Sequence, residues 1–245
     1  MRKEQNMKKN SIVTALNPRV LDETVPFAIR ESFNLLRTNL MYTISDDESG
    51  APVFAITSDH QGAGKSTVIT NLAISFTQIG HRVLLVDADL RRPTIHTYFG
   101  ISEKSKGLSE LMSGIETDVV NADVIPGLDV ITSGRIPPNP SELITSTKFA
   151  NFIADAKTKY DVVFIDFPPI GIVSDAVANC KSISGYIFTV RSGKSSAKSV
   201  NESLSSMEKV GAKIAGVVLN DCNIKGSSYV KRKGSRYGGY YGTKY

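Results

Sequence analysis

Short apolar runs alternate with stretches of helical periodicity over most of the chain, and this alternation is the strongest constraint on its fold. Six runs of four to six residues are spaced along the sequence: Val53–Thr57, Val83–Val86, Leu128–Thr132, Val162–Ile165, Tyr186–Val190 and Ile214–Leu219. Several are continuously apolar, which is typical of strands buried on both faces of a parallel sheet. The runs therefore predict strands.

Stretches of helical periodicity separate the predicted strands. They lie at Lys65–Ile79, Leu108–Ser113, Ser146–Lys159, Ser174–Lys181 and Ser195–Val210. Before the first strand, apolar side chains three to four residues apart predict a helix over Val25–Ile44, with Pro26 in its first turn. The alternation as a whole predicts an α/β domain with a doubly wound, mostly parallel sheet and helices on both faces.

The two ends of the chain differ from its middle in composition. Residues 1–24 are polar and lack periodicity, which predicts a flexible N-terminal arm before a domain at residues 25–225. Residues 226–245 are rich in Gly, Ser, Lys, Arg and Tyr and hold one aliphatic residue, Val230. Such a segment buries too little apolar surface to offset its ordering entropy, so we expect a disordered, tyrosine-rich tail.

The C-terminal tail also accounts for the net charge of +5. Six of the 29 basic residues and none of the 24 acidic ones lie beyond residue 224, which leaves 23 basic against 24 acidic residues before it. A nucleic-acid-binding domain more often spreads basic residues over a folded face, so this distribution argues against one. Lys194, Lys198 and Arg191 could help neutralise phosphate, but we interpret them as a solvated run of charge.

Membrane, secretion and disulfide signals are absent from the sequence. No apolar stretch approaches the roughly 18 residues of a membrane span, and no apolar segment follows the charged N-terminus as in a secretory signal. Cys180 and Cys222 stand apart, without the spacing of a metal site or a disulfide framework. We therefore expect a cytoplasmic protein.

A glycine-rich motif follows the first predicted strand and opens the next helix. It consists of Gly62, Ala63, Gly64, Lys65, Ser66 and Thr67. Glycines let a backbone wrap around phosphate, Lys65 can reach the β- and γ-phosphates, and the Ser66 hydroxyl can ligate Mg²⁺. The full phosphate-loop pattern has a further glycine where Asp59 stands. The alternative interpretation is an ordinary glycine-rich turn between strand and helix.

Two further motifs place carboxylates directly after apolar strands. Asp87 and Asp89 follow Val83–Val86, and Asp166 follows Val162–Ile165. One carboxylate can hold Mg²⁺ while another accepts a proton from an attacking hydroxyl. The alternative is that the first two cap the next helix and pair with nearby arginines. Each motif is weak alone, but all three in order at strand ends indicate a nucleotide site.

These motifs resemble those of the bacterial P-loop tyrosine kinases (BY-kinases), specifically the separate cytoplasmic kinases of capsule and exopolysaccharide systems. The family's D-x-D-x-R motif matches Asp87, Asp89 and Arg91. Its proline loop resembles Ile136–Leu143, and its terminal tyrosine cluster resembles residues 229–245. The resemblance extends over residues 25–245.

The chain departs from the family pattern at several positions. The E-x-x-R-x-x-R motif associated with ring assembly appears as Glu31, Asn34 and Arg37, with Asn in place of the first Arg. Phe167 follows the third motif where Thr is common. Gln61 and Ala63 stand where family members often have Pro and Glu. None of these departures removes a group that the chemistry needs.

The resemblance implies an ATP-dependent protein-tyrosine kinase of P-loop NTPase type. ATP would bind residues 62–67, with Lys65 offsetting charge on the transferring phosphoryl group. Ser66, Asp89 and Asp166 would organise Mg²⁺, and Asp87 would position or deprotonate the tyrosine hydroxyl. Arg91 belongs to the same catalytic motif. Asn220 stands where related ATPases contact adenine, and the alternative for it is a turn-forming residue after the last strand.

The resemblance also implies partners. The phosphate acceptors would be five tail tyrosines presented in trans by a neighbouring subunit, in a homo-oligomer: Tyr229, Tyr237, Tyr240, Tyr241 and Tyr245. A transmembrane modulator of the polysaccharide system would recruit the kinase to the inner face of the membrane and complete the nucleotide site. Other proteins would supply further tyrosine substrates, and no nucleic acid is expected as a partner.

Two alternatives come from other functional classes. An ATPase switch of the partitioning or positioning type shares the fold and the first motif, but has a second lysine where this chain has His60. Such a switch also has no reason to end in five tyrosines. A non-enzymatic nucleic-acid binder working through the basic, aromatic tail leaves both aspartate motifs unexplained.

Overall fold

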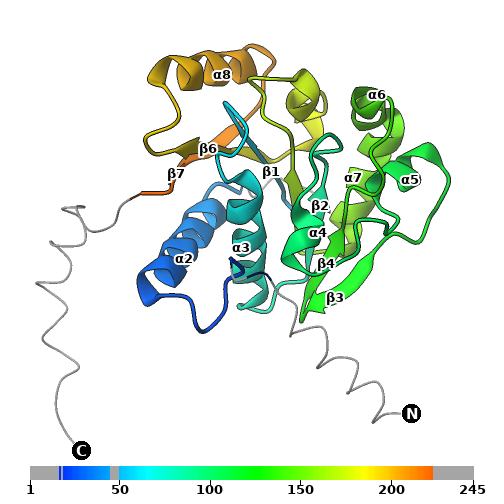
Figure 1. Ribbon diagram of the computed structural model, residues 1–245, viewed down its shortest axis with the longest axis horizontal. Coiled ribbons are helices and arrows are strands. Elements are labelled where there is room, and N and C mark those ends of the chain that lie inside the picture. The colour runs from blue at the N-terminus through cyan, green and yellow to red at the C-terminus, as the bar shows by residue number, and fades with distance from the viewer. Residues whose placement is uncertain (1–16, 18, 45–49, 223–245) are drawn as a thin grey trace, which may run out of the picture.

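The computed structural model describes residue 17 and residues 19–44 and 50–222. They form a seven-stranded sheet in the order β3-β4-β2-β5-β1-β6-β7, with β3 and β7 at opposite edges (Figure 1). The strands are β1 (Val53–Ser58), β2 (Val83–Asp87), β3 (Asn121–Ile125), β4 (Leu128–Ile131), β5 (Val162–Asp166), β6 (Gly185–Arg191) and β7 (Ile214–Asn220). All neighbours pair in parallel except β3 and β4. The predicted doubly wound, mostly parallel sheet is therefore confirmed.

One strand, β3, was not predicted from the sequence. It pairs antiparallel with β4 at the edge of the sheet, and its residues are exposed or half-buried. Asp123 within it has a positive φ of 54° and accepts a hydrogen bond from the Gly127 N–H at 3.0 Å. An edge strand with this local turn lacks the apolar run that identifies the central strands.

The helices lie at or near most of the predicted positions. They are α2 (Phe27–Met41), α3 (Lys65–Thr77), α4 (Ile95–Tyr98), α5 (Leu108–Ser113), α6 (Pro140–Thr145), α7 (Thr147–Lys159) and α8 (Ala197–Lys209). Two of them were not predicted. The four-residue α4 is too short to show periodicity, and α6 begins with a proline inside the predicted proline-rich loop.

The predicted helix at Ser174–Lys181 is wrong. The structure has two short 3₁₀ helices there, η2 (Ser174–Val177) and η3 (Cys180–Ser182). The Tyr186 hydroxyl donates a 2.7 Å hydrogen bond to the Ala176 carbonyl, which a continuous α-helix would use for its own ladder. A tertiary hydrogen bond thus replaces a local one.

Alternating side chains of the central strands feed two separate cores. In β1, Val53 and Ala55 pack with residues of α5, α7 and α8, while Phe54 and Ile56 pack with α2, α3 and α4. Both faces of the sheet are therefore covered, which explains why the central strands are apolar throughout. Figure 1 shows α2 lying beside α3 on the second of these faces.

Part of the predicted flexible arm at residues 1–24 packs against the domain. Val20 and Leu21 are buried, and the Leu21 N–H donates to Asn71 on α3 at 2.6 Å. Residues 1–16 and the whole predicted tail at 226–245 lie outside the described residues. Within the described part of the chain, no helix combines the length and apolar character needed to span a membrane.

Candidate active site

The three motifs meet because β2, β5 and β1 are neighbours in the sheet. Their carboxyl ends lie along one edge, so the loops that follow them face a shared crevice. The phosphate loop, defined here as residues 59–64, joins β1 to α3. Gly62 and Gly64 have φ angles of 74° and 92°, in the left-handed region that favours glycine. A Cβ at Gly64 would lie 2.0 Å from the side-chain nitrogen of Asn220, so glycine alone fits there.

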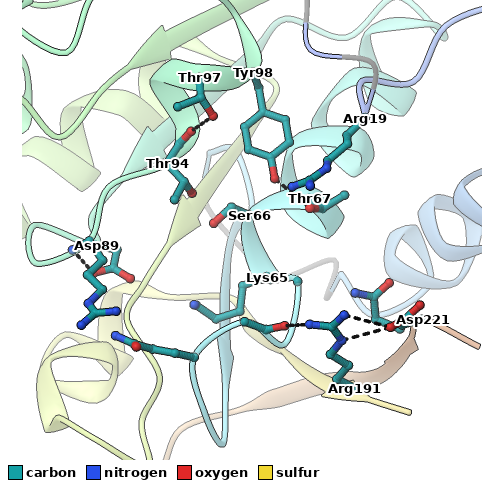
Figure 2. A pocket seen from close by; sticks show the side chains of 15 residues that line it. Arg19, Lys65, Ser66, Thr67, Asp89, Thr94, Thr97, Tyr98, Arg191 and Asp221 are labelled. Atoms are coloured by element: carbon teal, nitrogen blue, oxygen red, sulfur yellow. Dashed lines mark hydrogen bonds and ion pairs between the residues drawn. The ribbon is translucent and has the colours of Figure 1, made fainter. Parts of the chain in front are cut away.

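A cavity of about 600 Å³ opens over the phosphate loop and the start of α3 (Figure 2). The sequence-predicted residues that line it are Gly62, Gly64, Lys65, Ser66, Thr67, Asp89 and Asn220. The remaining lining includes Arg19, Tyr98, Arg191 and Asp221, which the sequence analysis did not assign to a site. Four predicted residues, Ala63, Asp87, Arg91 and Asp166, are not among the residues that line the cavity. The predicted binding residues are therefore brought together.

Asp166 and Ser66 form the best-defined candidate for a metal site. The Ser66 hydroxyl donates to Asp166 Oδ2, while Asp166 Oδ1 is buried and has no hydrogen-bond partner. Burial, with a smaller contribution from nearby Asp89, raises the Asp166 pKa to about 6, although Lys65 and the Ser66 hydroxyl favour the charged form. A divalent cation would supply the missing partner and offset the repulsion between the carboxylates. The residues present thus fit Mg²⁺.

The other ligands of such a cation would come from outside the protein. Among the described residues, no group of three or more Asp, Glu, His or Cys side chains is arranged to hold a metal ion. Mg²⁺ in nucleotide sites usually keeps several waters and binds through one or two carboxylates and the substrate phosphates. The sparse donor set at Ser66 and Asp166 therefore suits Mg²⁺ carried by a nucleotide.

Asp87 and Asp89 lie in different surroundings. Asp87 is fully buried, and Oδ2 accepts hydrogen bonds from the N–H groups of Thr94 and Ile95 at 3.1 and 3.0 Å. Burial, followed by the neighbouring Asp166, raises the pKa of Asp87 well above its ordinary value. Asp89 lines the cavity and accepts from the Arg92 N–H at 3.0 Å. Asp87 therefore caps the start of α4, as the capping alternative predicted, whereas Asp89 accepts an N–H in the turn before that helix and faces the cavity.

Arg91 connects the aspartate motif to two other elements. Its guanidinium forms a 3.2 Å ion pair with Asp175 of η2 and donates to the Ser141 hydroxyl of α6 at 2.7 Å. Ser141 lies in the predicted proline loop, so Arg91 ties that loop to the strand end that carries Asp87 and Asp89. Arg91 is not among the residues that line the cavity, and its contacts make it a link between loops.

Comparison with known proteins agrees with this geometry. The ParA family model, described as the NUBPL iron-transfer P-loop NTPase, matches residues 51–234. The tyrosine-protein kinase YwqD of Bacillus subtilis is 37% identical over 217 residues, which cover 87% of this chain and 86% of YwqD. The kinase domain of the Escherichia coli tyrosine kinase ETK superimposes with a TM-score of 0.81 at 31% identity, covering 94% of this chain and 86% of the solved kinase-domain chain. The chain belongs to the bacterial P-loop tyrosine kinases.

A solved structure described as the chimerical protein CapA2B2 is also similar to this kinase. Its TM-score is 0.74 at 40% sequence identity, and the match covers 80% of this chain and 86% of the other. Both solved structures thus match most of the chain. Their sequence identities are high enough to indicate a common family as well as a common fold. The family resemblance drawn from the three motifs is therefore confirmed.

Two residues distinguish the phosphate loop of this kinase from that of the ATPase switches. Asp59, at the position of the usual first glycine, accepts from the Ser195 hydroxyl at 2.9 Å. His60, at the position of the switches' second lysine, lies 2.9 Å from Asp59 through Nδ1. Both side chains are therefore engaged within the protein, and neither provides the long cation that the switch pattern requires.

Of the three α2 residues that resemble the family's ring-assembly motif, Arg37 contacts the protein's own α3. The Arg37 guanidinium donates to the Ser75 carbonyl of α3, so this arginine contacts its own chain. Glu31 accepts from the Asn34 amide at 3.3 Å on the surface of α2. Desolvation by burial lowers the pKa of Arg37. Asn34, which stands in place of the motif's first arginine, thus pairs with Glu31 within α2.

Several residues that line the cavity were not assigned to the site from the sequence. Arg191, interpreted there as part of a solvated charge run, contacts the phosphate loop and Asp221 instead. Tyr98 reaches the Thr67 hydroxyl at 2.7 Å and so joins α4 to α3. Arg19 lines the cavity from the N-terminal segment. No sequence motif marks these positions, because each depends on which elements become neighbours in the fold.

Proposed function

We propose that this chain is an ATP-dependent protein-tyrosine kinase that autophosphorylates its C-terminal tyrosine cluster in trans. By the same proposal it regulates capsular or extracellular polysaccharide synthesis or export. The observation that carries the proposal is the unpartnered Asp166 carboxylate oxygen, buried beside the Ser66 hydroxyl under a cavity that opens on Lys65. Family membership supplies the reaction class, and this arrangement supplies the means to perform it.

The residues at the cavity have separate roles in phosphoryl transfer. The phosphate loop and the first turn of α3 hold the phosphates, and Lys65 offsets charge on the transferring group. Ser66, Asp89 and Asp166 hold Mg²⁺. The metal, when bound, neutralises charge on the phosphate oxygens. Asp87, at the end of β2, is assigned to orient or deprotonate the tyrosine hydroxyl.

The adenine end of the nucleotide is assigned to the region of Asn220. This residue ends β7, lines the cavity and donates from its amide to the Ala63 carbonyl at 2.9 Å. The contact supports a role for Asn220 at the nucleotide, and it also gives the residue a structural task within the phosphate loop. The five acceptor tyrosines fall outside the described residues and belong to the proposal through the sequence alone.

An apolar groove beside the nucleotide cavity is proposed as the contact for a transmembrane modulator. The groove has a volume of about 560 Å³, lies between α2 and β7, and shares Asn220 and Asp221 with the cavity. Val217 and Leu219 on the edge strand β7 are 54% and 59% exposed. An apolar modulator segment seated there would complete the nucleotide site and hold the cytoplasmic kinase at the inner face of the membrane.

Incubation of the purified protein with Mg·ATP, followed by mass spectrometry of the tail, tests the kinase activity. We expect phosphate on the tail tyrosines of the wild type and none on the Lys65→Met variant. Phosphate release without any phosphotyrosine would instead identify an ATPase switch. The modulator's cytoplasmic segment is added in a parallel reaction, so that a requirement for activation is seen as a gain in phosphotyrosine.

Transfer between subunits is tested by mixing two variants. The donor is active but has all five tail tyrosines changed to Phe, and the acceptor carries Lys65→Met with an intact tail. Phosphotyrosine on the acceptor requires transfer in trans, since the acceptor's own site is inactive. If each chain phosphorylates only its own tail, the wild type is labelled and this mixture is not.

A further inference from the structure

The phosphate loop is held from outside by side chains that belong to neither the loop nor α3. The Arg191 guanidinium, at the end of β6, donates through Nη1 to the Gly62 carbonyl at 2.8 Å. The Asn220 amide, at the end of β7, donates to the Ala63 carbonyl at 2.9 Å. Arg191 and Asn220 are paired in the register of β6 and β7, so one strand pair delivers both contacts.

Arg191 is itself fixed by Asp221. Nε and Nη2 of the guanidinium each lie 3.0 Å from Asp221 Oδ2. Asp221 has a φ of 58°, in the left-handed region that residues with a side chain seldom adopt. The Arg191 side chain is 39% exposed, so burial does not account for its position. Figure 2 shows the guanidinium between Asp221 and the phosphate loop, with Lys65 on the other side of the loop.

The two carbonyl contacts determine where the neighbouring N–H groups point. No described peptide bond is cis, and in a trans peptide the C=O and N–H groups point in opposite directions. With the Gly62 and Ala63 carbonyls directed at Arg191 and Asn220, the N–H groups of Ala63 and Gly64 point away from β6 and β7. N–H groups of such a loop are the donors that bind phosphate.

Glycines make this restraint necessary. Gly62 and Gly64 have no Cβ to limit φ, so the peptide groups between them can rotate at low cost. A rotated peptide would present a carbonyl oxygen to the nucleotide phosphates and repel them. We propose that Arg191, held by Asp221, is a positioning residue that keeps the phosphate loop in its phosphate-binding conformation before the nucleotide arrives. The inference rests on the nucleotide site proposed above.

We call the contact of Arg191 with Asp221 and the Gly62 carbonyl the clamp. Amide hydrogen exchange of the nucleotide-free protein tests it directly. Arg191→Gln and Asp221→Asn are compared with Lys198→Gln, which removes one exposed charge from α8 away from the cavity. We expect faster exchange in peptides spanning residues 59–64 for both clamp variants and unchanged exchange for the control. Unchanged exchange in Arg191→Gln would overturn the clamp whether or not the protein binds nucleotide, which separates this inference from the site itself.

Steady-state kinetics distinguish a clamp from a direct phosphate contact. Loss of a hydrogen bond from a charged donor that preorganises the loop is expected to raise the KM for ATP about tenfold while kcat changes little. Asp221→Asn is expected to raise KM in the same direction, and the double variant should be no worse than Arg191→Gln alone. A fall in kcat for Arg191→Gln with normal KM in Asp221→Asn would overturn the clamp and make Arg191 a phosphate ligand.

A charge-conserving variant completes the test. Lysine keeps the positive charge but cannot reproduce a guanidinium fork that contacts Asp221 and the Gly62 carbonyl together. We therefore expect Arg191→Lys to retain the raised KM and the faster exchange. Wild-type KM in Arg191→Lys would show that charge alone is needed and would overturn the positioning role.

Discussion

At the scale of single residues, the site separates two carboxylates that are close in sequence. Asp87 is buried and accepts backbone N–H groups, whereas Asp89 lies at the cavity. The strand β2 ends at Asp87, so the chain turns between the two residues and gives them different neighbours. Loss of the Asp87 oxygens would therefore affect the structure as well as the chemistry.

Substitution of Asp89 and Asp87 by asparagine distinguishes a role in catalysis from a role in holding the backbone. Asp89→Asn is expected to reduce kcat by orders of magnitude and to change the Mg²⁺ dependence, with little change in Tm. Asp87→Asn is expected to reduce kcat similarly and to change Tm only slightly, because the Asn oxygen can still accept from Thr94 and Ile95 and the substitution removes a buried carboxylate whose pKa burial raises. Kinetics and thermal unfolding of both variants provide the measurement. Near-normal turnover in Asp87→Asn would limit that residue to capping.

Lys65 is the second residue whose role a single substitution tests. It is buried at the start of α3 and close enough to Asp166 to favour the charged carboxylate. Lys65→Met is expected to abolish phosphotyrosine while the protein stays folded, because methionine keeps most of the length of the side chain without its charge. Anti-phosphotyrosine detection and circular dichroism measure the two effects. Undiminished tail phosphorylation in a folded variant would contradict the assignment of the phosphate site.

At the scale of elements, Glu110 joins α5 to the segment that leads into the proline loop. Its Oε2 accepts from the Gly107 N–H at 2.9 Å and the Ser109 hydroxyl at 3.0 Å, and Oε1 accepts from the Arg135 N–H at 3.2 Å. Burial alone would raise the Glu110 pKa, but these hydrogen bonds outweigh it and lower the pKa below its ordinary value. The ionised carboxylate therefore stabilises the folded state.

Replacement of Glu110 by Gln is expected to lower the free energy of unfolding by about 1–3 kcal/mol at neutral pH. The folded-state pKa is depressed, so the stabilisation is present above the unfolded-state pKa and is lost as the pH falls through the folded-state value. The difference between wild type and variant should therefore shrink below about pH 4. Urea unfolding at several pH values measures it. A difference that is constant with pH would show that the charge of Glu110 does not contribute.

At the scale of the whole molecule, charge is divided between the body and the tail. The segment from Lys225 onward holds six basic residues and the five tyrosines proposed as acceptors, while residues 1–224 are close to neutral. Each phosphotyrosine adds about −1.5 to −2 charges, so full phosphorylation changes the tail from about +6 to roughly −2 to −4. We therefore expect an unmodified tail to be attracted to the carboxylates of a neighbour's site and a phosphorylated tail to be repelled from them.

Phosphorylation is therefore expected to loosen assemblies that depend on tail docking. Light scattering before and after addition of ATP measures their size, and a variant with all five tyrosines changed to Phe is the control. The effect should weaken as salt rises, because exposed charges are screened over about 8 Å at physiological ionic strength. One size throughout, despite full phosphorylation, would show that the tail does not control assembly.

The sequence by itself determined the central strands, most helices and the three motifs. Buried parallel strands need continuous apolar runs, and phosphate binding needs glycines and a lysine at fixed spacing, so both leave local patterns. These local patterns are sufficient to identify Lys65, Ser66, Asp89 and Asp166 as candidates for the site. They also identify the family, since the motifs occur in a fixed order.

Tertiary structure alone decided the remaining features. Arg191 lies 129 positions from Gly62 in the sequence, and their contact exists because β6 is the neighbour of β1 in the sheet. The 3₁₀ turns at residues 174–182 form where a distant tyrosine takes a carbonyl that a helix would use. Strand order and long-range hydrogen bonds depend on the whole chain packing at once, and local periodicity carries no record of them.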